Sequence, residues 1–136
     1  MGLTQIKVEV QGADFAGAFT RIIQTQADAL FVSPHQIMFK HSKGIVNFAN
    51  TNRLPALFGA REFVEAGGLM SYYTDWIDLK RQAAVYVDKI LKGSNPTDLP
   101  VEWPRKFDLV INLKTAKQIG VTIPSEILLQ ADKVIK

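Results

Sequence analysis

Short apolar runs alternate with amphipathic stretches along most of this chain, and that alternation restricts the possible folds more than any other feature. Residues 27–32 and 54–58 are short and almost continuously apolar, as is typical of strands that are covered on both faces. Residues 15–23 and 75–92 instead repeat apolar side chains every three or four positions, as amphipathic helices do. Strands that alternate with helices predict the α/β class, here a three-layer sandwich with a mainly parallel sheet.

The rest of the chain fits the same alternation. Residues 3–10 interleave polar and apolar side chains, which predicts a strand with one buried face. The other predicted elements are, in chain order, a helix at 37–50, a helical turn at 61–66, a strand at 69–72, an irregular proline-containing connector at 94–104, a strand at 107–111, a helix from 112 to 120 and a last helix from 124 to the end.

The composition is that of one domain with its own core, and it excludes several kinds of site. The chain has 136 residues, 47% of them hydrophobic, and a formal net charge of only +3. Because the basic residues stand singly, we expect no nucleic-acid binding. The absence of cysteine excludes disulfides and thiolate zinc sites. His35 and His41 are six residues apart, so they point to different faces of a helix, and we expect neither a metal nor a cofactor.

Polar and aromatic residues follow three of the predicted strands at their carboxyl ends. In an open parallel sheet these ends meet at one edge, and ligands bind there. The candidate ligand-binding residues are therefore Ser33, Pro34, His35, Arg61, Glu62, Tyr72, Tyr73 and Thr74. Aromatic rings that pack against apolar groups, beside a few polar groups that orient the ligand, suit a small amphiphilic solute.

Some of these groups also have a purely structural interpretation. Arg61 can clamp a ligand carboxylate with its planar guanidinium, or it can form a surface ion pair with Glu62. Tyr72, Tyr73 and Trp76 can make an aromatic shelf, or Tyr72 can complete a strand while Trp76 packs under the next helix. The chain has no nucleophile, phosphate-binding or dinucleotide-binding motif, so we expect a binding protein and no enzyme.

The chain resembles ABC-transporter substrate-binding proteins of the uncharacterised type that includes tryptophan- and tyrosine-binding proteins. The resemblance rests on RLPA at 53–56, REFVEAGGLMSY at 61–72, RQAAVYVDKILKG at 81–93, LPVE at 99–102, FDLVINLKTAK at 107–117 and ADKVI at 131–135. It covers essentially the whole chain, but only the second half of such a protein. Tyr73 stands where the family usually has Gly, and Ser33 stands where Asp often precedes Pro34.

The resemblance implies the second lobe of a type I periplasmic binding protein. Two α/β lobes of such a protein close on a small solute and deliver it to an ABC permease. Residues 1–74 then form the α/β ligand-binding lobe. Residues 75–136 form a crossover helix, a proline-containing hinge connector and a carboxy-terminal strand–helix segment.

The resemblance implies a fragment of the solute-binding component of an ABC-type uptake transporter, which holds a small molecule such as an amino acid in the cleft between two lobes. The alternative is a cytosolic ligand-sensing or dimerisation domain that reuses such a lobe. The family is periplasmic or exported, but the first residues lack the charged and then apolar pattern of an export signal. As written, we therefore expect a cytoplasmic chain.

The helix at 75–92 leads to a further expectation. Its apolar stripe consists of Leu79, Ala83, Tyr86, Val87 and Ile90. In two-lobed binding proteins of this kind, such a helix packs on the first lobe. Each large apolar side chain left in water forgoes about 1.5–3 kcal/mol of burial free energy. We therefore expect a homodimer through this helix, with the proline-containing connector as its hinge.

Overall fold

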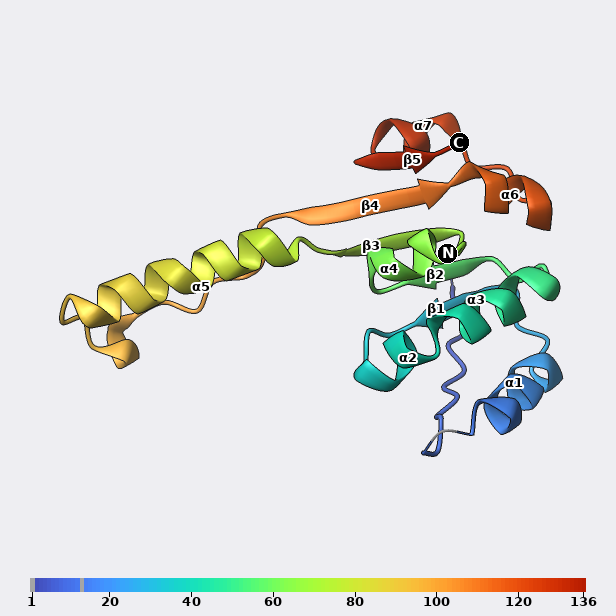
Figure 1. Cartoon of the computed structure of the whole chain (residues 1–136), viewed down its shortest axis with the longest axis horizontal. Helices are drawn as coiled ribbons and strands as arrows, with labels where there is room; N and C mark the ends of the chain where they lie inside the picture. The colour runs from blue at the N-terminus through green and yellow to red at the C-terminus, as the bar shows by residue number, and fades with distance from the viewer. Residues whose placement is uncertain (1, 13) are drawn as a thin grey trace.

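A five-stranded sheet is the centre of the computed structural model, which describes residues 2–12 and 14–136 (Figure 1). The strands lie side by side in chain order as β1 (Leu30–Val32), β2 (Ala56–Phe58), β3 (Met70–Thr74), β4 (Phe107–Asn112) and β5 (Lys133–Ile135). All neighbouring strands are parallel except β3 and β4, which are antiparallel. The prediction of an α/β fold with a mainly parallel sheet is confirmed.

Helices connect the strands and flank the sheet. They are α1 (Phe15–Gln24), α2 (Gln36–Lys40), α3 (Ser42–Thr51), α4 (Arg61–Glu65), α5 (Trp76–Leu91), α6 (Leu113–Ile119) and α7 (Ser125–Leu129), with a 3-10 turn η1 (Pro96–Asp98). Local sequence fixes several helix ends. The side chain of Asp14 accepts a hydrogen bond from the amide of Gly17, and Asn112 does the same for Thr115. Gly120 ends α6 in the left-handed conformation, with a φ of 80°.

One face of the sheet holds the main core. Strand register and the alternation of side chains place Val32, Phe58 and Ser71 on this face. Helix α3 contributes Ile45 to the same buried cluster, and α4 contributes Phe63. The rings of Phe58 and Phe63 stack with their centroids 5.0 Å apart, and neither residue has any exposed surface. Burying each of these rings stabilises the fold by about 1.5–3 kcal/mol.

The opposite face of the sheet is covered only in part. Met70 packs there beside Ile119 of α6. Phe31, Tyr72 and Phe107 remain exposed by 59%, 52% and 41%. Tyr72 and Phe107, on the paired strands β3 and β4, stack with a centroid distance of 5.4 Å. Part of the sheet therefore presents an aromatic strip to solvent.

The predicted strand at 3–10 is wrong. None of these residues belongs to a strand, and Leu3 and Ile6 are exposed by 90% and 54%. An alternating pattern defines an apolar face, but a strand also needs a hydrogen-bonded neighbour. Among the described residues, no strand pairs with this segment.

Two helix predictions also need correction. The helix predicted at 37–50 is broken into α2 and α3 at His41, whose φ of −108° leaves the helical range. At this break the ring of His41 packs against Phe15 of α1, with the ring centroids 4.5 Å apart. The last helix does not run to the end, because the chain turns back after α7 and β5 pairs with β4.

Helix α5 and the chain that returns from it project away from the sheet (Figure 1). This part leaves the sheet after Thr74 and re-enters it at Phe107, and these two residues are partners in the β3–β4 register. No residue of α5 is buried. We refer to residues 75–106 as the arm and to the rest of the folded chain as the body.

Candidate functional site

The carboxyl ends of β1, β2 and β3 lie at one edge of the sheet, because the three strands are parallel. The sequence-predicted residues follow or complete these strands, so the structure brings them to this edge. We call this group the rim, which comprises Ser33, Pro34, His35, Arg61, Glu62, Tyr72, Tyr73 and Thr74. The arm leaves the sheet at the same edge, directly after Thr74.

Gly59 allows the first two rim loops to approach each other closely. Its amide donates a hydrogen bond to the carbonyl of Val32 at 3.0 Å. A Cβ atom on Gly59 would lie 2.4 Å from Cδ of Pro34, closer than real side-chain contacts come, and 3.1 Å from the nitrogen of Pro34, which is tighter than most. The loop that carries Pro34 can therefore keep this position only because residue 59 has no side chain.

Ser33 and His35 stand on the exposed side of the first rim loop, and Pro34 between them is half-buried. The Nδ1 atom of His35 accepts a weak hydrogen bond of 3.5 Å from the amide of Ile37, so His35 caps α2. Both the imidazole and the serine hydroxyl remain accessible to a ligand.

Arg61 is held by a carboxylate one helical turn away. Its Nε and Nη2 atoms donate to Oε1 of Glu65 at 3.3 and 3.1 Å. The sequence pointed to Glu62 as a local partner, but residues four apart on a helix face each other and adjacent residues do not. Both side chains are about half exposed, so this ion pair contributes at most about 0.5 kcal/mol. Arg61 is therefore only weakly held by Glu65.

The two tyrosines of the rim pack against different aromatic partners. Tyr72 and Tyr73 are adjacent in β3, so their side chains point to opposite faces of the sheet. Tyr72 stacks on Phe107, whereas the ring of Tyr73 lies 5.6 Å from that of Trp76 at an angle of 46°. Tyr72, Tyr73 and Trp76 therefore do not make one shelf. Trp76 is the first residue of α5 and is 49% exposed.

A pair of opposite charges ties the two ends of the arm together beside Thr74. The ammonium of Lys106 lies 3.1 Å from a carboxylate oxygen of Asp75, and the amide of Asp75 donates to the carbonyl of Lys106 at 3.0 Å. The same carboxylate caps α5 by accepting from the amides of Ile77 and Asp78. The hydrogen bond from Lys106, followed by those amides, holds the pKa of Asp75 below its ordinary value, and Asp75 raises the pKa of Lys106.

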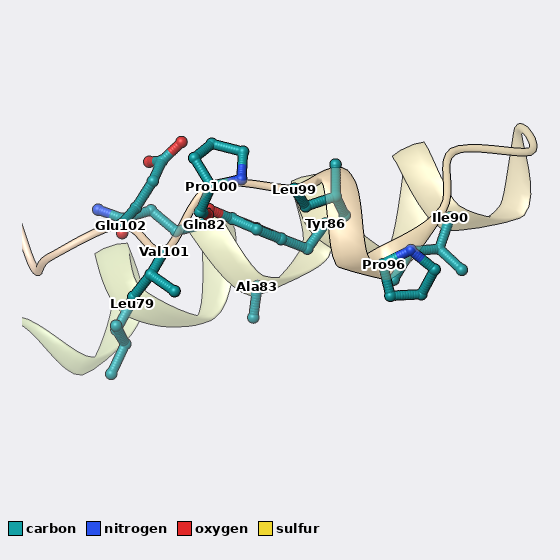
Figure 2. A pocket seen from close by; sticks show the side chains of 10 residues that line it. All are labelled: Leu79, Gln82, Ala83, Tyr86, Ile90, Pro96, Leu99, Pro100, Val101 and Glu102. Carbon is teal, nitrogen blue, oxygen red and sulfur yellow. The ribbon is translucent and has the colours of Figure 1, made fainter.

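A groove of about 440 Å³ runs along the arm between α5 and the returning connector (Figure 2). It is lined by Leu79, Gln82, Ala83, Tyr86, Ile90, Pro96, Leu99, Pro100, Val101 and Glu102. The hydroxyl of Tyr86 donates to the carbonyl of Pro100 and so ties the helix to the connector. A second groove of about 120 Å³ lies beside Ile22 and Leu54. Neither of these two grooves is lined by a rim residue.

The apolar stripe of α5 is therefore less exposed to solvent than the sequence indicated. Leu79, Ala83, Tyr86 and Ile90 line the groove and face the connector, whereas Val87 is 55% exposed. The connector folds back along one side of the helix and covers the stripe in part, but Ala83, Val87 and Ile90 remain exposed.

Two further properties concern residues 2–12 and 14–136. Within this range, no three His, Cys, Asp or Glu side chains come together in a way that could hold a metal ion. None of the helices in the same range has the length and apolar character needed to cross a membrane.

Comparison with known proteins identifies the family. The model of a family described as ABC transporter substrate binding protein matches residues 1–135. The chain belongs to this family. A comparison with curated proteins gives no match.

Three solved structures resemble this substrate-binding domain. A conserved domain protein from Vibrio cholerae O1 biovar El Tor has a TM-score of 0.78 at 31% identity, over 90% of this chain and 41% of its own. An ABC domain from Streptococcus pneumonia in complex with L-Trp has a TM-score of 0.76 at 30% identity, over 90% and 41%. The ligand-free, open structure of CD0873, a substrate binding protein with adhesive properties from Clostridium difficile, shares the fold, with a TM-score of 0.67 at 20% identity over 93% and 42%. The chain spans about two fifths of the length of these structures.

Sequence reasoning missed two features of this substrate-binding domain. Of the Asp75–Lys106 pair, the sequence indicated only one partner. Asp75 precedes an amphipathic stretch as a helix cap does, but nothing in the sequence links it to Lys106, which lies far along the chain. The close approach of Gly59 to Pro34 could not be predicted from the sequence, where the glycine itself was the only indication. Both features depend on how the strands are placed side by side.

Proposed function

We propose that this chain is the carboxy-terminal, ligand-binding lobe of a solute receptor for an ABC-type uptake transporter, and that its solute is an amino acid. Family membership supports a solute-binding domain. The 30% identical ABC domain, whose structure contains L-Trp, supports an amino acid as the solute. The observation that carries the proposal is the meeting of three strand ends at one edge, where they gather charged, hydroxyl and aromatic groups beside the departing arm.

The rim offers a partner for each part of an amino acid. Arg61 leaves Glu65 and binds the carboxylate of the solute through two parallel hydrogen bonds. Glu62, which is exposed on the same helical turn, accepts from the ammonium group. Tyr73 and Trp76, already paired at the base of the arm, pack against the solute side chain.

In this proposal the complete receptor also has the first lobe, which closes the cleft, and the receptor passes the solute to an ABC permease outside the cytoplasm. A cytosolic ligand-sensing or dimerisation domain is the second candidate. The exposed apolar residues of α5 favour it, since a self-associating module needs such a surface.

Thermal unfolding in the presence of each of the 20 amino acids tests the proposed solute. One lobe supplies only part of the contacts, so we expect a dissociation constant of about 1 mM or weaker, equivalent to about −4 kcal/mol. Ten millimolar L-Trp should therefore raise the melting temperature of the wild-type chain by binding the folded state. Arg61→Gln should abolish that shift. The matched control is Arg53→Gln, the same change at an exposed position before β2, and it should leave the shift intact.

Two results would contradict the proposal. One is a melting temperature that no amino acid changes at millimolar concentration. The other is a shift that survives in Arg61→Gln, which would show that the solute binds away from the rim.

A further inference from the structure

The arm joins the body at two neighbouring points of the sheet. Thr74, where the chain leaves, and Phe107, where it returns, are partners in the β3–β4 register. Beyond them the amide of Asp75 donates to the carbonyl of Lys106 at 3.0 Å, and the two side chains form an ion pair at 3.1 Å. These bonds oppose a bend within the plane of the sheet, because such a bend would slide one crossing past the other. A bend out of that plane needs only changes of a few backbone dihedrals, so we expect the arm to swing toward one face of the sheet or the other.

Two aromatic contacts lie at this junction, one on each face of the sheet. Tyr72 and Phe107 share one face, and their stack joins two strands of the body. Tyr73 points to the opposite face, which it shares with Ser71 and the main core, and which we call the core face. Its partner Trp76 is the first residue of α5. Of these two contacts, the one between Tyr73 and Trp76 therefore connects the body to the arm.

We propose that the contact between Tyr73 and Trp76 is a hinge stop, which prevents the arm from swinging toward the core face. The ring centroids are 5.6 Å apart and the ring planes are inclined by 46°. Aromatic rings in contact have centroid separations of about 4.5–7 Å, so these two rings already touch. A swing toward the core face would press them together, whereas a swing toward the opposite face would only separate them.

The backbone that carries each ring is held in place. Tyr73 is half-buried and lies in the hydrogen-bonded β3–β4 pair. Trp76 begins a helix whose first turn is fixed by Asp75, since that carboxylate accepts from the amides of Ile77 and Asp78. Tyrosine and tryptophan have only two χ angles, so their rings are more rigid than long flexible side chains. Two such rings on fixed backbone can limit a hinge.

The stop controls how near the arm can come to the rim. Met38 of α2 packs against the main core cluster and Phe63 of α4 belongs to it, so both helices lie on the core face. His35 caps α2 and Arg61 begins α4, so a swing toward the core face would carry the arm toward these rim groups. The stop keeps the arm away from them. This consequence for solute access rests on the proposed function, whereas the stop itself needs no solute.

Distances between two spin labels test the stop in the full chain. The chain has no cysteine, so Lys43→Cys on α3 and Ser94→Cys just beyond α5 provide two exposed labelling sites. Helix α3 packs on the core face, so the distance between the labels shortens when the arm swings that way. Adding Tyr73→Ala should raise the fraction of chains with shorter distances by about 2- to 10-fold. Trp76→Ala should do the same, and the two changes together should add nothing further, since either one removes the contact.

Three controls separate the stop from a general loosening of the chain. Tyr72→Ala removes the same kind of ring one residue earlier, on the opposite face, and should leave the arm distances unchanged. Tyr73→Phe keeps the ring and loses only the hydroxyl, so it should behave like the wild type. Labels at Lys43→Cys and Lys117→Cys, both exposed and both in the body, should give the same distance with and without Tyr73→Ala. If Tyr73→Ala does change that distance, Trp76→Ala tests the same contact from the arm.

Two results would overturn the inference. One is a set of arm distances in Tyr73→Ala and Trp76→Ala that matches the wild type, which would show that the ring contact does not limit the arm. The other is an equal gain of short distances in Tyr72→Ala, which would show that the loss of either ring loosens the junction without a preferred direction. Failure of every amino acid to bind would remove the proposed solute but would leave these distances as expected, so the two tests give separate answers.

Discussion

The body and the arm both contain amphipathic helices, but only the body buries them. Helix α3 has 10 residues and buries Ile45, Val46 and Ala49 against the sheet. Helix α5 has 16 residues and buries none. Both repeat apolar residues at helical spacing, so the pattern cannot account for the difference. It arises from what lies opposite each helix, which is a sheet face for α3 and a single strip of connector for α5.

The comparison teaches that an amphipathic pattern shows which face of a helix is apolar, but not which surface covers that face. It also separates two kinds of stability. The core around Phe58 and Phe63 should unfold with the whole molecule, whereas the arm, which has few buried contacts, should open by itself.

Truncating an aromatic ring in each region should show the largest contrast. Phe63→Ala should reduce the free energy of unfolding by about 3–5 kcal/mol, because it leaves a cavity beside Phe58. Trp103→Ala, in the arm, should change it by no more than about 0.5 kcal/mol, since Trp103 is 84% exposed. Urea denaturation of both variants provides the measurement.

Phe63→Ala can cost more than the whole stability of the domain, so Phe63→Leu serves as a milder variant. It should be intermediate between Phe63→Ala and the wild type. Equal losses for Phe63→Leu and Trp103→Ala would mean that the arm is as well packed as the body, and the comparison would fail.

Two glycines of the body should respond to the same added methyl group with opposite signs. A Cβ on Gly68 would lie 2.6 Å from a ring carbon of Phe58 and 2.8 Å from the carbonyl oxygen of Phe63. Gly68→Ala should therefore destabilise the fold by about 1–3 kcal/mol. Gly44 lies in α3 with nothing within 4 Å, so Gly44→Ala should stabilise the fold by about 0.5–1 kcal/mol.

Chemical denaturation of both glycine variants under one set of conditions measures this pair. A Gly68→Ala variant as stable as the wild type would show that the ring of Phe58 and the backbone carbonyl of Phe63 move aside easily. The body would then be loosely packed, and its contrast with the arm would be smaller than the structure indicates.

Sequence reasoning predicted most of the elements that have a strong local pattern. The longest helix, α5, repeats apolar residues over four turns, and the short apolar runs at 27–32 and 54–58 contain β1 and β2. The failures lie where the pattern was short or needed a distant partner. Three residues are too few for β5 to show a period, and residues 3–10 alternate without a neighbouring strand.

The candidate site divides in the same way. A general rule about parallel sheets was enough to place Ser33, Arg61 and Thr74 at one edge. The pairing partner of Arg61 and the opposite directions of Tyr72 and Tyr73 became clear only when the helix and strand had exact bounds. Which residues gather was predictable, but how each side chain is engaged was not.

The smallest expected effect is confined to the base of the arm and depends on pH. The pKa of Asp75 in the folded chain is lowered from 3.8, first by Lys106 and then by the amides that the carboxylate caps. A carboxyl group whose pKa is lower in the folded state adds stability above its unfolded pKa. That contribution should be complete at neutral pH, and it should disappear as the pH falls below about 4 and through the lowered folded value.

Amide hydrogen exchange of α5, corrected for the intrinsic effect of pH, can separate the two roles of Asp75. In the wild type, protection of α5 should decrease between pH 6 and pH 3 while the core around Phe58 stays protected. Asp75→Asn keeps a side-chain acceptor for the cap but loses the charge, so α5 should be less protected than in the wild type and no longer sensitive to acid. Asp75→Ala should be the least protected at every pH. If Asp75→Asn keeps the acid sensitivity of the wild type, the Asp75–Lys106 pair does not hold the arm. If the core loses protection together with α5, the arm and the body open as one unit.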